Sequence, residues 1–154
     1  MRILLAPALF LLLGACGPAP RPAPPSKPAE LPKPADESRR FPHDNLVETK
    51  VVDSALLGKP FMPGGTLARY KKGNREFVMF AGKLPSPTGA ALLLLDWKKS
   101  LVGAKLVPSF GGYFGMDDNR PVFVFPKGNW IAGVAGLPEK EADLQARALA
   151  SRLN

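Results

Sequence analysis

Residues 66–85, with the sequence TLARYKKGNREFVMFAGKLP, and residues 121–138, with the sequence PVFVFPKGNWIAGVAGLP, decide the fold of this chain. Each stretch holds a run of β-forming residues, a Lys-Gly-Asn turn and a second such run. A glycine beside an asparagine supplies the positive φ angles that a tight hairpin needs. Both stretches then continue through Ala-Gly and Leu-Pro. Each therefore predicts a β-hairpin that leads into a helix.

The residues after the first hairpin predict a helix over about 87–100. Ser86 has the position of an N-cap and Pro87 that of the first helical residue. Residues 90–97 are apolar apart from Asp96. A helix that is apolar on every side is normally enclosed by protein, so we expect this one to be largely buried.

The second hairpin leads to a helix over about 138–152, which Pro138 opens. Acidic residues lie early in this segment and arginines late, as the helix dipole favours. Its inner stripe is predicted to consist of Ala142, Ala146, Leu149 and Leu153.

Shorter patterns complete the predicted fold. Strands are expected over 47–54, 106–107 and 110–116, and Asp117-Asp118-Asn119 is expected to be a turn. Together these elements predict an α+β domain, with an antiparallel sheet and two helices on one face. The two hairpin–helix stretches suggest a duplicated ββα unit. Their offset falls from 55 to 53 residues, so duplication needs two single-residue shifts, and coincidence stays open.

The N-terminus has the pattern of a secretory signal. Arg2 precedes an apolar run over 3–13, which at eleven residues is too short to span a bilayer. Leu13-Gly14-Ala15-Cys16 follows, and this motif resembles the lipobox of bacterial lipoproteins. The alternative is a chance cysteine at the end of an ordinary signal.

The resemblance implies that residues 1–15 are a signal peptide and that Cys16 carries a covalent lipid. Gly17 stands where lipoproteins retained at the inner membrane commonly have Asp. In a Gram-negative cell this implies an outer-membrane lipoprotein that faces the periplasm. Two or more acyl chains would make the membrane attachment effectively permanent.

Residues 16–42 are rich in proline and predict an extended spacer between the lipid and a folded domain over 43–154. Proline fixes φ and removes a hydrogen-bond donor, so this segment is not expected to form helix or sheet. At about 3.1 Å per residue the spacer could reach roughly 80 Å. The two sharper alternatives are a ligand for a proline-binding module and a tether that spans the cell wall.

The distribution of basic residues indicates one candidate binding surface. The formal net charge is +8, without any block of five like charges. The densest basic group is Arg69, Lys71, Lys72 and Arg75, in which the first two share one face of a strand and the others flank the turn. Such a group is either a solvated sheet edge or a surface for an anionic envelope polymer or lipid. An exported chain without a recognisable binding motif is not expected to bind nucleic acid.

Residues that carry out chemistry are scarce. Lipidation of Cys16 would leave the domain without a thiol, and His43 is the only histidine, which argues against zinc and against a histidine-based triad. Asp117-Asp118-Asn119 lacks the spacing of a calcium loop. Gly111-Gly112 and Gly115 lack the strand–loop–helix context of a phosphate loop. We expect no cofactor beyond the covalent lipid and no metal.

The domain loosely resembles small uncharacterised periplasmic α+β domains, through Gly111-Gly112-Tyr113-Phe114-Gly115 and Lys127-Gly128-Asn129-Trp130. No functional residue carries over from this resemblance. The leading hypothesis is a non-enzymatic lipoprotein that binds another envelope protein or assists an envelope complex. The second is a module for an anionic envelope polymer or lipid, and the third is a hydrolase with paired carboxylates.

Overall fold

The structure, a computed structural model, describes residues 33–154. The expected signal peptide, Cys16 and the linker up to residue 32 lie outside the described residues. The elements of the described part, in chain order, are η1 (Ser38–Arg40), β1 (Leu46–Ser54), η2 (Leu56–Gly58), β2 (Pro63–Lys72), β3 (Arg75–Lys83), α1 (Pro87–Ser100), β4 (Val102–Val107), β5 (Gly112–Asp117), β6 (Arg120–Lys127), β7 (Trp130–Ala135) and α2 (Glu139–Ala150).

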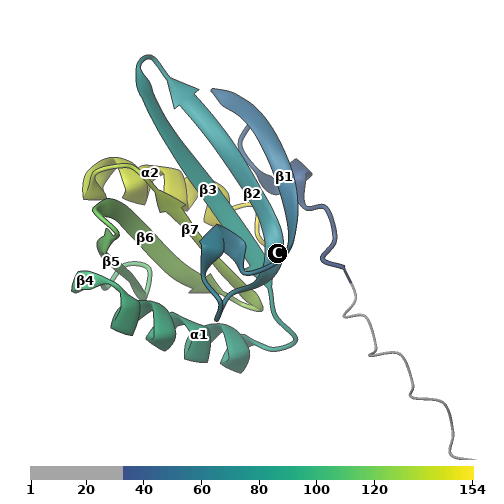
Figure 1. Ribbon diagram of the computed structural model, residues 1–154, viewed down its shortest axis with the longest axis vertical. Helices are drawn as coiled ribbons and strands as arrows, with labels where there is room; N and C mark the ends of the chain where they lie inside the picture. Colours follow the sequence, from purple (N-terminus) through teal and green to yellow (C-terminus); the bar gives the residue numbers. More distant parts are fainter. Residues whose placement is uncertain (1–32) are drawn as a thin grey trace, which may run out of the picture. The chain divides into compact units, whose positions relative to one another are not determined.

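Seven strands form one sheet in the order β1-β2-β3-β7-β6-β5-β4, and every neighbouring pair is antiparallel (Figure 1). The predicted α+β class with an antiparallel sheet is confirmed. Both predicted Lys-Gly-Asn hairpins form, with Gly73 at φ 61° and Gly128 at φ 55°. Asp118 and Asn119 also have positive φ, so this segment is the predicted hairpin turn.

The first helix begins and ends at the predicted residues. The side chain of Ser86 accepts a hydrogen bond of 3.1 Å from the backbone N–H of Gly89, and Pro87 is the first helical residue. The second helix is shorter than predicted at both ends. β4 is longer than predicted. Its register against β5 shifts between Val102 and Lys105, and Gly103, which lies in this interval, has a φ of 66°.

The two helices lie on opposite faces of the sheet, so the prediction that both would cover one face is wrong. Successive side chains of β3, β6 and β7 alternate between two core clusters. The cluster under α1 contains Phe80, Val122, Val124, Ile131, Leu93, Leu94 and Trp97. The cluster under α2 contains Met79, Phe123, Phe125, Ala132, Val134, Ala142, Ala146 and Leu149. In Figure 1 the strands pass in front of α2, whereas η2, on the α1 side, crosses in front of the strands.

A one-residue difference between the hairpins explains this arrangement. Ala81 lies seven residues after Asn74, whereas Ala135 lies six residues after Asn129. Because side chains alternate along a strand, a shift of one residue moves the matched alanine to the other face. Ala81 packs in the α2-side cluster and Ala135 in the α1-side cluster. The chain therefore leaves the two hairpins toward opposite faces, while duplication itself stays a prediction.

The last part of the predicted linker belongs to the folded body. Phe41 is fully buried in the α2-side cluster, and the Tyr70 hydroxyl donates a hydrogen bond of 2.9 Å to the carbonyl of Pro42. The backbone N–H of Glu37 bonds Thr66 Oγ1 at 3.1 Å. We call residues 34–42 the strap. The folded part therefore begins before residue 43, the start that the sequence predicts.

Helix α1 is less buried than the sequence predicts. Ala90, Leu93, Leu94 and Trp97 pack on the sheet, but Leu92 is 60 % exposed and Leu95 is 47 % exposed. The sheet covers only one side of the helix, and nothing in residues 33–154 covers the other. Within the same residues, no helix is long and apolar enough to cross a membrane.

Candidate binding groove

The four basic residues that the sequence singled out divide between the two faces of the sheet. Arg69 lies opposite Val78 in the register of β2 and β3, and Val78 packs on the α1-side cluster. Lys71, two residues further along the strand, shares that face. Lys72 and Arg75 face the other way and line a groove beside α2. The four do not form one continuous surface.

Carboxylates pair with three of these four cations. Arg69 lies 3.2 Å from Glu48 on β1, and Lys71 lies 3.9 Å from Glu76 on β3. Arg75 contacts Glu141 of α2 at 2.5 Å. All six side chains are largely exposed, so each pair contributes little to stability. Their effect is to reduce the positive charge that the sequence pattern predicted.

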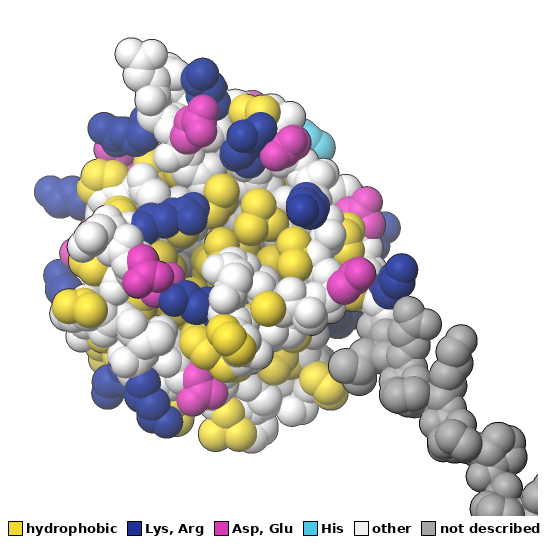
Figure 2. Space-filling view, viewed as in Figure 1, with side chains coloured by type: hydrophobic (Ala, Val, Ile, Leu, Met, Phe, Trp, Pro, Cys, Tyr) yellow, Lys and Arg dark blue, Asp and Glu magenta, His cyan; other side chains and the backbone are white. Residues whose placement is uncertain are grey.

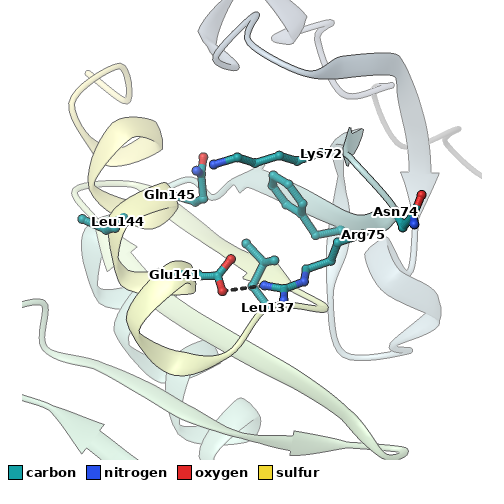
Figure 3. A pocket seen from close by; sticks show the side chains of 8 residues that line it. Lys72, Asn74, Arg75, Leu137, Glu141, Leu144 and Gln145 are labelled. Atoms are coloured by element: carbon teal, nitrogen blue, oxygen red, sulfur yellow. Dashed lines mark hydrogen bonds and ion pairs between the residues drawn. The ribbon is translucent and has the colours of Figure 1, made fainter.

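A groove of about 530 Å³ separates the tip of the β2–β3 hairpin from α2 (Figure 3). Its floor is formed by Phe77 of β3 and Leu137, both almost fully buried. Leu144 of α2 stands at its outer side and is 66 % exposed. The groove therefore combines an apolar floor with a large exposed apolar side chain at its rim.

Polar side chains form the rest of the rim. Figure 3 shows Arg75 and Glu141 joined across the groove, with Lys72 and Gln145 pointing toward one another. Asn74, at the hairpin turn, completes the lining. Lys72 makes no ion pair with any residue of the described part.

The local structure places each of these residues. Arg75 and Phe77 point to the same side because they are two residues apart on β3. Glu141, Leu144 and Gln145 have the i, i+3, i+4 spacing that aligns side chains on one side of a helix. Sequence reasoning missed the groove because its two walls lie about sixty residues apart in the chain.

The groove has the chemistry of a binding site. Its apolar floor can take a buried side chain, Lys72 can pair with an acidic group, and Asn74 and Gln145 offer amide donors and acceptors. Glu141 is its one carboxylate, and this group already pairs with Arg75. A hydrolase of the two-carboxylate type needs a second carboxylate that faces the same space.

The remaining candidates lie outside the groove. His43 is exposed, just after the strap. Asp117 pairs with Lys59. Gly112 leaves no room for a side chain beside the carbonyl of Val124, so its role is close packing of strands. Among the described residues, no group of three or more His, Cys, Asp or Glu side chains could hold a metal ion.

No family model, curated protein or solved structure matches this chain.

Proposed function

We propose that this chain is a lipid-anchored protein of the bacterial cell envelope whose folded part is a non-enzymatic binding module. The groove between the β2–β3 hairpin and α2 receives a segment of a partner protein. The observation that carries this proposal is the apolar floor of Phe77 and Leu137 beneath a polar rim with one unpaired lysine. The matching segment presents an apolar side chain next to an acidic group.

The charge pattern favours a protein partner over an anionic polymer. A polyanion is best held by cations that lie on one face and lack internal partners. Here two of the four cations lie on each face, and three of the four pair with carboxylates. A mixed rim around a small apolar centre is instead the usual composition of a protein interface.

The start of the strap and the groove lie toward different ends of the sheet, whereas the end of the strap, at Pro42, bonds Tyr70 beside the groove floor. The strap contacts Thr66 of β2, whereas the groove lies at Lys72, six residues along the same strand. At about 3.3 Å per residue these points are roughly 20 Å apart. The proposed lipid on Cys16 precedes the strap in the chain, so the tethered segment enters the fold away from the groove.

Site-specific photo-crosslinking in intact cells tests the proposal. A photoreactive residue replaces Leu144 in the groove, and a matched control replaces the exposed Lys50 on β1. We expect position 144 to give one discrete protein adduct, position 50 to give none, and mass spectrometry to place the adduct on a segment with an acidic and an apolar residue. Equal labelling from both positions, or no protein adduct from position 144, would contradict the proposal.

Charge reversal on the two faces provides a matched comparison. Lys72→Glu with Arg75→Glu alters the groove, whereas Arg69→Glu with Lys71→Glu alters the opposite face by the same charge. We expect only the first pair to abolish the adduct. Loss with both pairs would favour the hypothesis of an anionic polymer or lipid, because that hypothesis depends on the total charge.

A further inference from the structure

The outer side of α1 is a second surface without a partner. Thr88, Leu92 and Leu95 have the i, i+4, i+7 spacing of one helix side, and all three are exposed. An apolar stripe on the outside of a helix whose inside is already packed calls for a second apolar environment. Within the described residues no element provides one.

Cations lie beside this stripe. Lys98 and Lys99 occupy the last turn of α1, and both are exposed. Lys99 lies 3.6 Å from Asp96, and this exposed ion pair costs little to break. The Lys98 ammonium lies over the ring of Tyr113, 5.3 Å from the ring centre. The outer side of α1 therefore offers apolar and cationic side chains together, and an anionic lipid surface can bind both kinds.

The surface around α1 adds to the apolar area. Leu57, Phe61, Leu67 and Val78 all pack at the margin of the α1-side cluster and are only half-buried. Figure 2, in the same view as Figure 1, shows hydrophobic side chains gathered in the middle of this face, with basic and acidic side chains around them. The α2 face, which holds the groove, is the opposite one.

The chain enters the fold at the end of the sheet where α1 begins. Pro34 and Ala35 line a small hollow with Lys83, the last residue of β3, and α1 starts four residues later at Pro87. Sixteen residues, 17–32, separate Cys16 from the described part, and at full extension they reach roughly 55 Å. The strap itself lies on the α2 side of the sheet, and a lipid on Cys16 would keep the whole folded part, α1 included, within roughly 55 Å of the bilayer. Such a tether gives weak contacts a high effective concentration.

We infer that the outer side of α1, through Leu92, Leu95, Lys98 and Lys99, docks on the surface of an anionic lipid bilayer. The inference rests on the proposed lipid anchor. Docking holds the α1 face against the headgroups and turns the α2 face, with its groove, toward the surrounding compartment. The anchor determines which membrane the protein occupies, and α1 determines how the domain is oriented there.

Depth-dependent fluorescence quenching tests this inference on the full lipidated protein. Because Cys16 is the only cysteine and would be blocked by lipid, a new cysteine can be labelled alone. Thr88→Cys places a fluorophore on the outer side of α1, and Asn74→Cys places the same fluorophore at the hairpin tip. The protein is reconstituted into vesicles of phosphatidylethanolamine and phosphatidylglycerol that contain brominated lipid.

We expect quenching at position 88 and none at position 74. Leu92→Gln with Leu95→Gln, or Lys98→Glu with Lys99→Glu, should abolish the quenching at position 88 while the protein still floats with the vesicles. Lys127→Glu with Lys140→Glu, exposed lysines on the α2 side, should leave it intact. Vesicles of phosphatidylcholine alone should weaken it.

Equal quenching at both positions, or none at position 88, would overturn the inference while leaving the anchor in place. Energy transfer between labelled copies at position 88 would overturn it in favour of self-association. A protein that fails to float with vesicles at all would overturn the anchor and this inference together. Failure of the groove experiment affects neither result, because that experiment probes the other face.

Discussion

The hydroxyl of Tyr70, near the end of β2, donates a hydrogen bond of 2.9 Å to the carbonyl of Pro42 in the strap. The Tyr70 ring also stacks on Phe77, with 4.9 Å between ring centres. Phe77 forms the floor of the groove. One side chain therefore links the segment through which the chain enters the fold to the proposed binding site.

Tyr70→Phe should destabilise the fold by about 1 kcal/mol, because it removes the hydrogen bond and leaves the Pro42 carbonyl unpaired. Stacking on Phe77 is retained, so we expect the groove to keep its shape. Urea denaturation at neutral pH measures the change. No change in the free energy of unfolding would show that the strap gains nothing from this bond.

The same variant should change the response to alkali. Burial raises the pKa of the Tyr70 hydroxyl above its ordinary value of 10.0. As the pH rises, this hydroxyl would then ionise first in the unfolded chain. Its contribution to the free energy of unfolding is therefore full below pH 10 and falls above it, by at most about 1.4 kcal/mol per pH unit. Tyr70→Phe should reduce this loss. Tyr113→Phe, which removes the other tyrosine, is the control that should leave the loss in place.

Phe41→Ala should destabilise the fold by about 3–5 kcal/mol, because it empties a fully buried position in the α2-side cluster. Arg39→Ala is the control within the strap, since Arg39 is exposed, and it should change stability by no more than about 0.5 kcal/mol. Thermal unfolding of both variants measures the difference. Equal melting temperatures would mean that the strap does not form part of the core.

Local signals predicted the elements whose evidence lies within a few residues. The start of α1 follows from Ser86 and Pro87, and the three hairpin turns follow from Gly-Asn and Asp-Asp-Asn. In each case one backbone conformation satisfies the local hydrogen bonds, and the residue type shows which one.

The sequence did not predict how distant segments pack together, and each case has a specific reason. The face on which each helix packs depends on one extra residue between Asn74 and Ala81, relative to the second hairpin. In the sequence, this extra residue looks like a small change in the offset between two repeats. Phe41 lay in a proline-rich stretch whose composition predicted an extended spacer. The groove required Arg75 and Glu141 to meet, and they are 66 residues apart.

Gly133→Ala should cost about 3 kcal/mol or prevent folding, because an added Cβ would overlap the carbonyl of Phe123 and the ring of Phe80. Gly89→Ala, in the first turn of α1, is the matched control. Its Cβ would meet Leu84 Cδ2 at 3.4 Å, an ordinary contact, and alanine favours the helix by about 0.5–1 kcal/mol. Denaturant midpoints that moved in the same direction for both variants would contradict the packing of β7 against β3 and β6.

Cys16→Ala should separate the anchor from the fold. The thiol is the proposed site of lipid attachment, so the variant should remain as an uncut precursor or leave the membrane fraction, and it should no longer incorporate labelled palmitate. The folded part should be unaffected, with the melting temperature and the groove adducts at position 144 preserved, since Cys16 lies seventeen residues before the described part begins.

Gly17→Asp is the informative companion, because it keeps the thiol. In a Gram-negative host it should preserve palmitate incorporation and shift the protein to the inner membrane. A processed Cys16→Ala protein that stays in the membrane fraction would show that something other than lipid holds it there, and the outer side of α1 would then have to act without a tether.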